Sequence, residues 1–323
     1  MHWRGRKVLV TGGAGFLGSN LCHALATQGA RVVALDGFLF GGGANPANLE
    51  GAEVELVRAD IRDVDLRPLC EGAEVIFNLA AQTSHMGGQR DPLADIAVNA
   101  VAQVRLIQAA REAAPDAVVV HASTRQFYGR AHHLPVDEEH PVNPPDANGV
   151  SKFAGEQYWM IEHRVNGRPV VSLRLTNCYG PRLRIRDARQ TFLGIWIRSV
   201  LEDRPFEVWG GEQLRDMTYV DDVTNAFLLA GATPACHGRI FNIGGSPPAS
   251  LKEIADITVR VAGAGARYTI REFPADRARI DIGSYHADDR AFRQATGWTP
   301  EVGLEDGIRR SLDWFRPRLA AYL

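Results

Sequence analysis

Three glycines near the start of the chain are spaced as in a turn that holds nucleotide phosphates. Gly12, Gly15 and Gly18 follow an apolar run at residues 8–10 and lead into a stretch with helical periodicity. In such a turn the first glycine permits a tight bend, the second lets the backbone approach a pyrophosphate, and the third lets the helix pack on the strand. Free N–H groups at the helix N-terminus then bind phosphate oxygens. The spacing therefore predicts a dinucleotide site.

An acidic residue stands where the next strand is expected to end. Asp36 follows the apolar run 31–35. A carboxylate at this place accepts hydrogen bonds from the adenine-side ribose hydroxyls and repels a 2′-phosphate. The residues directly after it, 37–40, include no arginine that could bind such a phosphate. The sequence therefore predicts NAD rather than NADP.

Composition excludes several classes of protein. The chain has 323 residues, 45% of them hydrophobic, and 36 basic residues against 38 acidic ones. A net charge of −2 offers no basic surface for nucleic acid. With no apolar run of 18 residues and no cleavage signal, we expect no membrane partner and a cytoplasmic location. No two of the four cysteines have CxxC spacing, so we expect reduced thiols and no metal site.

The elements that must position these residues alternate along the first half of the chain. Apolar runs that fit buried parallel strands lie between stretches of helical periodicity, which are 16–27, 93–114 and 149–163. This alternation predicts an α/β fold with a doubly wound parallel (Rossmann) sheet. The expected strands are 7–11, 31–35, 54–57, 75–79, 118–122 and 170–175.

The second half of the chain is more irregular. Gly-Gly and Pro-Pro pairs separate a short strand at 240–243 from helices expected at 191–202, 223–230, 251–262 and 304–314. We therefore expect a Rossmann domain at 1–175, which also receives elements around 216–245. A smaller α/β substrate lobe at 176–323 is interleaved with it.

Several further segments resemble those of one family. The segments are Asp60-Ile61, 78–81, Asn99, Ser123-Thr124, 127–129, 152–156, 174–181, 215–222 and 297–300. Together with the Gly-x-x-Gly-x-x-Gly spacing, they resemble the extended short-chain dehydrogenase/reductase family, in the branch of sugar-nucleotide epimerases and dehydratases. The resemblance covers about residues 7–315.

The resemblance implies NAD as cofactor and a nucleoside-diphosphate sugar as substrate, bound between the two lobes. The base of the nucleotide stays open among UDP, GDP and dTDP. The residues that the glycine turn and the resemblance assign to the cofactor are Gly12, Gly15, Phe16, Leu17, Gly18, Asp36, Asp60, Ile61, Leu79, Ala80, Ala81, Asn99 and Lys152.

One catalytic position departs from the family pattern. In this family a tyrosine four residues before the lysine accepts the proton of a sugar hydroxyl, and a Ser or Thr hydroxyl shares the reacting oxygen. Lys152 and Thr124 match two of these roles, but Asn148 stands at the tyrosine position. An amide is no useful base near pH 7, and losing a general base typically costs about 10²–10⁴ in rate.

Three explanations for Asn148 stay open. Another group accepts the proton, or the chain is a binding module for NAD and sugar nucleotides without turnover, or this chain carries a substitution. Under the first, the candidates are Lys152, whose pKa can fall beside a positive cofactor, Tyr128, and His85, an imidazole suited to proton transfer. If the pocket is otherwise intact, Asn148→Tyr is expected to restore the family arrangement.

The residues after Thr124 bear on the reaction. In the related dehydratases an acid pair follows this hydroxyl and eliminates water, whereas this chain has Arg125-Gln126. Dehydration and decarboxylation are therefore disfavoured. The sequence predicts an epimerase that removes and returns a hydride at one sugar carbon, taken as C4, and a dehydrogenase or dehydratase remains the alternative.

The substrate diphosphate requires cationic partners, because guanidinium groups bind phosphate oxygens in a bidentate manner. Arg215 is expected to fill this role, with Arg277 or Arg279 as a second partner. Ser84, His85, Thr124 and Asn177 complete the expected substrate site. The resemblance also implies a homodimer that pairs through the helices at 93–114 and 149–163.

Overall fold

A seven-stranded parallel sheet forms the centre of the computed structural model, which describes residues 3–39, 42–187, 191–245 and 247–323. Its strand order is β11-β6-β5-β4-β1-β2-β3. These strands are β1 (Lys7–Thr11), β2 (Arg31–Asp36), β3 (Glu55–Arg58), β4 (Val75–Asn78), β5 (Val118–Thr124), β6 (Val170–Leu175) and β11 (Arg239–Ile243). The predicted α/β doubly wound fold is confirmed.

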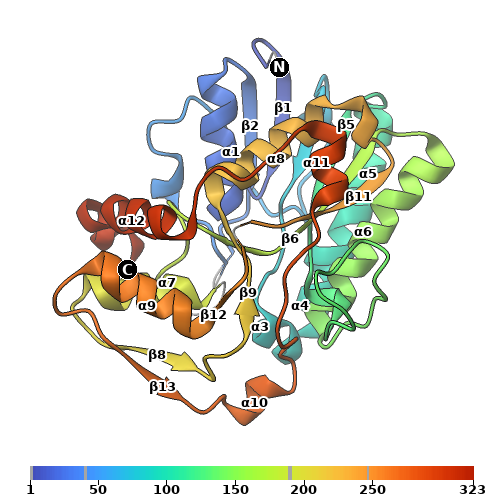
Figure 1. Cartoon of the computed structure of the whole chain (residues 1–323). Coiled ribbons are helices and arrows are strands. Elements are labelled where there is room, and N and C mark those ends of the chain that lie inside the picture. The colour runs from blue at the N-terminus through green and yellow to red at the C-terminus, as the bar shows by residue number, and fades with distance from the viewer. Residues whose placement is uncertain (1–2, 40–41, 188–190, 246) are drawn as a thin grey trace.

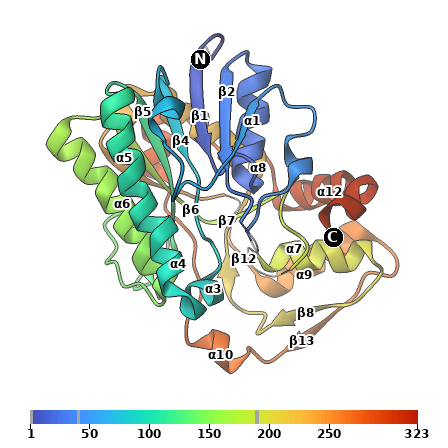
Figure 2. The ribbon, with the colours of Figure 1, turned by 180° about the vertical axis from the view of Figure 1, so that it is seen from behind.

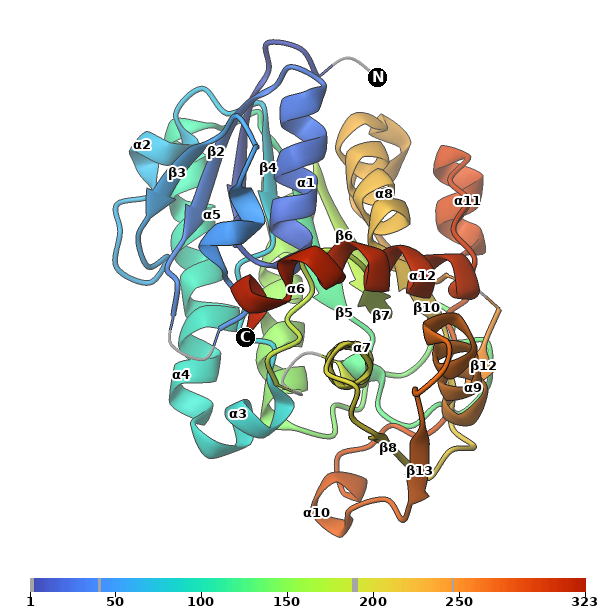
Figure 3. The same ribbon diagram turned by 90° about the vertical axis from the view of Figure 1, so that its left-hand side faces the viewer.

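Helices cover both faces of the sheet, so the central strands are buried on both sides (Figure 1, Figure 3). One face packs against α1 (Phe16–Thr27), α8 (Val220–Ala232) and α11 (Arg290–Thr296), with Phe77, Phe227 and Phe241 in the shared core. The other face packs against α2 (Arg67–Cys70), α5 (Ala102–Ala113) and α6 (Ala147–Asn166). The near-continuous apolar composition of the strands follows from this double cover.

A smaller lobe lies beyond the carboxyl ends of the strands (Figure 1, Figure 2). It has its own apolar core, in which Trp196, Phe206 and Phe315 are buried. Its helices are α7 (Phe192–Leu201), α9 (Leu251–Ala262), α10 (Ala275–Ala278) and α12 (Leu304–Phe315). Its strand pairs are β7 (Asn177–Tyr179) with β10 (Met217–Tyr219), β8 (Phe206–Trp209) with β13 (Tyr268–Arg271), and β9 (Leu214–Arg215) with β12 (Ala249–Ser250).

One long helix predicted from the sequence is divided into several elements. The stretch 93–114 forms α4 (Pro92–Ile96), a π-helical turn, η2 (Ala97–Val101), and α5. A short helix before it, α3 (His85–Arg90), was not predicted. Single-turn π segments inside helices frequently accompany functional sites. Short 3₁₀ turns complete the chain at Pro46–Leu49, Gln126–Tyr128, Pro234–Cys236 and Arg316–Tyr322.

Among the described residues, no helix is long and apolar enough to cross a membrane. No group of three or more metal-ligating side chains occurs among the same residues. All four cysteines are free thiols.

Candidate active site

The glycine turn joins β1 to α1 at the carboxyl edge of the sheet. Gly12 has a φ of +69°, and a Cβ there would lie 2.9 Å from the backbone N of Ala80. A Cβ on Gly18 would lie 2.1 Å from the carbonyl O of Gly12, so α1 packs directly on the turn. Gly15 is the N-cap of α1, and within the described chain no side chain caps this helix. The N–H groups in the first turn of α1, which have no partner within the helix, are therefore the ones placed to bind a pyrophosphate.

Asp36 lies beside this turn at the end of β2. Its two carboxylate oxygens accept hydrogen bonds from the backbone N–H of Ala14 (3.0 Å) and of Phe38 (2.9 Å). Burial raises the pKa of this carboxyl, and these N–H groups oppose the rise. Each oxygen keeps a lone pair for a ribose hydroxyl. Arg58 is the register partner of Asp36, and its guanidinium stacks on the ring of Phe38 at 4.9 Å. A cation that was not predicted from the sequence therefore also borders this site.

The other predicted cofactor residues line the neighbouring strand ends. Leu79 and Ala80 donate their backbone N–H groups to the Thr11 hydroxyl, both at 3.1 Å. Ile61 is buried in the core. Asp60, one of the predicted cofactor residues, forms a bidentate pair with Arg62 (2.6 Å between Oδ2 and Nη2). Phe16 and Leu17 open α1, and Ala81 continues the loop after β4.

Asn99 fixes the loop that follows β4. From the π-helical turn its side chain accepts the N–H of Gln82 and donates to the carbonyl of Gln82, both at 3.0 Å. A Cβ on Gly155 would lie 2.2 Å from the Asn99 carbonyl, so α6 packs closely against this turn. Asn99 therefore holds the loop at residue 82 in place.

Lys152 is a buried cation on α6. Its Nζ lies 3.5 Å from the carbonyl O of Ala122 on β5. Burial lowers the pKa of this ammonium to about 8, and the negative charges of Asp95 and Glu156 oppose the change. Lys152 is therefore poised to lose or hold a proton near neutral pH.

Asn148, one turn before Lys152, is 1% exposed and points at the loop after β4. Its amide donates to the carbonyl of Gln82 and to Oδ2 of Asp95, both at 2.9 Å. The packing is tight, because a Cβ on Gly88 of α3 would lie 3.3 Å from the Asn148 Cβ. The space around the Asn148 amide is therefore filled by α3 and α4.

Thr124 ends β5 and connects to a carboxylate that the sequence analysis missed. The Thr124 hydroxyl accepts the N–H of Gln126 (3.2 Å), and the Gln126 amide donates to Oδ2 of Asp146 (3.0 Å). The same oxygen lies 3.0 Å from Nδ1 of His85. Although burial raises the pKa of Asp146, His85 and the N–H of Gly149 lower it below its usual value. In the sequence, Asp146 could be recognised only as a residue type that commonly caps the N-terminus of a helix.

Tyr128 lies in the core and is not retained as a proton acceptor. Its ring is fully buried, and its hydroxyl donates to Asn242 Oδ1 (2.9 Å) and accepts from Arg174 Nη1 (2.6 Å). Burial raises the pKa of this hydroxyl to about 12, although Arg174 opposes the rise. Because the Tyr128 hydroxyl already donates one hydrogen bond and accepts another, and because its pKa is raised, this side chain contributes to the packing of the core.

Two arginines approach each other where the sheet meets the smaller lobe. Arg215 is 7% exposed and pairs with Oδ1 of Asp281 at 3.2 Å. Burial and the charge of Arg125 lower the pKa of Arg215 to about 10, although Asp281 and Asp216 oppose the change. Arg125 donates to Oδ1 of Asn177 (2.9 Å) and stacks on Tyr285 at 5.0 Å. Two neighbouring guanidinium groups in a buried place suit an anion such as a diphosphate.

The two arginines expected as a second partner of the diphosphate lie at α10. Arg277 stacks on Trp209 at 4.7 Å, and Arg279 is exposed after α10. Arg125 is instead the cation whose field acts on Arg215. In the sequence, only the position of Arg125 directly after Thr124 indicated that this arginine lies near the site. Ser84, expected to bind substrate, caps α3 through the N–H of Gly87 (3.1 Å).

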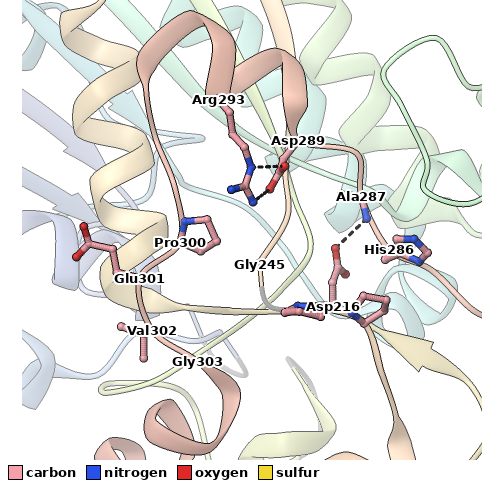
Figure 4. A pocket seen from close by; sticks show the side chains of 12 residues that line it. Asp216, Gly245, His286, Ala287, Asp289, Arg293, Pro300, Glu301, Val302 and Gly303 are labelled. Carbon is pink, nitrogen blue, oxygen red and sulfur yellow. Dashed lines mark hydrogen bonds and ion pairs between the residues drawn. The ribbon is translucent and has the colours of Figure 1, made fainter.

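A pocket of about 560 Å³ opens beside Asp216 (Figure 4), and its lining does not include the glycine turn, Thr124 or Lys152. Asp216 accepts the N–H of Ala287 at 2.9 Å, and Asp289 pairs with Arg293 at 2.6 Å. Burial raises the pKa of Asp216 to about 6. Because this pocket includes none of the predicted cofactor residues, we place the candidate active site at the carboxyl edge of the sheet.

The fold and this edge define a dinucleotide-binding α/β protein in which Thr124 ends a central strand and Lys152 packs against that same strand. The chain belongs to the NAD-dependent epimerase/dehydratase family, whose model matches residues 8–244. A relative described as UDP-glucose 4-epimerase, from Mycolicibacterium smegmatis, is 36% identical over 314 residues, covering 96% of this chain and 98% of the relative.

Solved structures show the same architecture. UDP-glucose 4-epimerase from Thermotoga maritima, solved with UDP-glucose, superposes with a TM-score of 0.87 at 26% identity, covering 97% of this chain and 99% of that one. UDP-glucuronic acid 4-epimerase from Bacillus cereus, solved with UDP-glucuronic acid and NAD, has a TM-score of 0.84 at 29% identity, covering 96% and 99%. The prediction of NAD agrees with these findings and with the cradle at Gly12.

Proposed function

We propose that this protein is an NAD-dependent epimerase of UDP-linked sugars that inverts C4. The observation that carries the proposal is the meeting of the glycine turn, Thr124 and Lys152 at one edge of the sheet, with Arg125-Gln126 in place of an acid pair. Relatives that act on UDP-sugars support the choice of nucleotide. The sugar lies between the Rossmann domain, 1–175, and the lobe formed by 176–323.

Each part of this chain has a role in the proposed reaction. NAD, when bound, would supply the acceptor and donor of the hydride at the sugar carbon. The glycine turn and Asp36 hold the dinucleotide, while Arg215 and Arg125 hold the diphosphate of the substrate. Thr124 donates a hydrogen bond to the reacting sugar oxygen, and Lys152 supplies positive charge beside it. No carboxylate at 125 or 126 is present to eliminate water.

The test is turnover of a panel of UDP-, GDP- and dTDP-hexoses, with products identified by ¹H NMR. We expect UDP-glucose and UDP-galactose to interconvert with NAD in catalytic amount and without net NADH. NADH formed in proportion to product would identify a dehydrogenase. Tight NAD binding without turnover of any sugar in the panel would identify a binding module, and a 4-keto-6-deoxy product would identify a dehydratase.

A homodimer is the second part of the proposal. Apolar side chains are exposed along α4, the π-helical turn and α6. They include Leu93 (78% exposed), Ile96 (43%), Val101 (53%), Tyr158 (47%), Ile161 (41%) and Val165 (73%). A stripe of exposed apolar side chains on neighbouring helices is typical of an interface with a second copy.

Charges placed on this stripe are expected to dissociate the dimer. Ile161 and Val165 are one helical turn apart on α6, so Ile161→Asp/Val165→Asp puts two carboxylates on one face. Light scattering coupled to gel filtration should give twice the chain mass for the wild type and the chain mass for this variant. Ile270→Asp, at an exposed apolar residue of β13, is the control that should leave the mass unchanged. A monomeric wild type would refute the proposal.

A further inference from the structure

A histidine and a buried aspartate meet at the start of α6. His85 Nδ1 lies 3.0 Å from Asp146 Oδ2, and the Asp146 side chain is fully shielded from solvent while that of His85 is 38% exposed. The ring N–H does not point squarely at the carboxylate, so the two groups are in close contact without a well-aligned hydrogen bond. Contacts between catalytic groups are often imperfectly aligned before substrate binds.

The pair is joined to the hydroxyl at the end of β5. Asp146 Oδ2, which faces His85, also accepts from the Gln126 amide at 3.0 Å, and the Gln126 N–H binds the Thr124 hydroxyl at 3.2 Å. Asp146 Oδ1 accepts the N–H of Gly149 at 2.7 Å and caps α6. Both carboxylate oxygens are thus fixed, and one continuous set of contacts leads from His85 to Thr124.

Asn148 holds the loop that carries the histidine. Its amide donates to the Gln82 carbonyl at 2.9 Å, and Asn99 binds both the N–H and the carbonyl of Gln82 at 3.0 Å. Ser84 then caps α3, whose first residue is His85. The loop is therefore fixed on both sides of Thr83. A residue as large as tyrosine at 148 would have to displace α3.

On this geometry, and resting on the function proposed above, we propose that the His85–Asp146 pair replaces the missing tyrosine as proton acceptor and donor. Asp146 holds the ring proton on Nδ1, which leaves the Nε2 lone pair free. The sugar hydroxyl proton moves to Nε2 while the carbon-bound hydrogen leaves with its electron pair as hydride to NAD⁺, and a carbonyl forms. Return of the hydride to the opposite face, with the Nε2 proton going back to oxygen, completes the inversion. His85 is the catalytic residue, and Asp146 and Asn148 are positioning residues.

The exposed fractions favour His85 over the other candidates named from the sequence. Tyr128 is fully buried with its hydroxyl engaged on both sides, and Lys152 is 9% exposed with its Nζ near the Ala122 carbonyl. The side chain of His85 keeps 38% of its surface open. Of the three groups, it has the most room to meet a sugar hydroxyl.

The experiment compares His85→Gln, His85→Ala and Asp146→Asn with the wild type. His85→Gln should lower the rate of epimerisation about 10²–10⁴-fold, as expected for loss of a general base. His85→Ala should regain turnover when imidazole is added. Asp146→Asn, which still caps α6, should give a loss between wild type and His85→Gln. Affinities for NAD and UDP, measured by calorimetry, should stay within about 3-fold of wild type, less than 1 kcal/mol.

A readout that needs no turnover is the tautomer of His85. In ¹⁵N NMR spectra of the free protein, assigned by comparison with His85→Gln, we expect the proton on Nδ1, and Asp146→Asn should redistribute it between the ring nitrogens. His133→Gln is the matched control, because His133 pairs with Asp137 at 3.6 Å in an exposed loop, and it should turn over normally.

Three results would overturn the proposal: full turnover of His85→Gln, no rescue of His85→Ala by imidazole, or the proton on Nε2 in the wild type. A gain of turnover in Asn148→Tyr would also contradict it, since that change displaces the loop that holds His85. A wild type that epimerises no sugar nucleotide would refute the proposed function instead, and the tautomer would still test the pair.

Discussion

Lys152→Met is expected to lower the rate of epimerisation by about 10²–10⁴-fold, the range for loss of a group that assists proton transfer. The ammonium is buried beside β5, where its charge acts through little solvent, and methionine keeps the volume while removing that charge. Steady-state kinetics on UDP-galactose measures the effect. Lys252→Met, at an exposed lysine paired with Asp256, is the control and should retain the wild-type rate.

The same variant should change stability in the opposite direction. The pKa of Lys152 is about 8 in the folded chain against an ordinary value of 10.5, so between these pH values the unfolded chain binds a proton that the folded chain does not. The contribution of this group to the free energy of unfolding therefore rises with pH across the window and is least favourable below pH 8.

Removal of the buried charge should accordingly stabilise the fold at pH 7 by up to about 3 kcal/mol, an advantage that shrinks as the pH rises from 8 to 10.5. Urea denaturation of both proteins at pH 7 and pH 10 measures it. Equal rates for wild type and Lys152→Met would contradict the catalytic role. A stability difference independent of pH would contradict the lowered pKa.

Arg215→Ala is expected to weaken UDP binding far more than NAD binding. Truncating one partner of a buried charge pair costs on the order of 2–5 kcal/mol, which corresponds to roughly 30- to 5,000-fold in affinity. Arg215 also donates to the carbonyl of Leu214 at 2.9 Å, so some stability will be lost as well. Calorimetry with UDP and with NAD separates the two effects.

A variant of the second arginine tests diphosphate binding without relying on Arg215→Ala, which also loses stability. Arg125→Met removes the neighbouring guanidinium, which stacks on Tyr285, and should also weaken UDP selectively. Arg309→Ala is the control, because Arg309 is exposed on α12, pairs with Glu305 and Asp306, and should matter little for UDP. Equal losses for UDP and NAD in Arg215→Ala would mean that this arginine only supports the fold.

Much of the fold could be predicted because its signals are local. Apolar runs at residues 7–11 and 170–175 form buried parallel strands with the predicted bounds, and the pattern at 16–27 forms α1 as predicted. The glycine turn was recognisable because Gly12 and Gly18 are needed for backbone reasons that hold in any such turn. Short elements such as α3 and β9 were missed, since a few residues carry too little periodicity.

The sequence by itself determined the dinucleotide turn and the acid at Asp36, and it predicted the departure at Asn148, because each depends on residue type at a fixed spacing. Tertiary structure alone decided what surrounds them. His85 and Asp146 are 61 positions apart, and Arg125 and Arg215 are 90 apart, so no local pattern relates them. Burial of Tyr128 was equally invisible. Proton affinity and charge pairing depend on distance and solvent exclusion, which exist only once the strands and both lobes have packed.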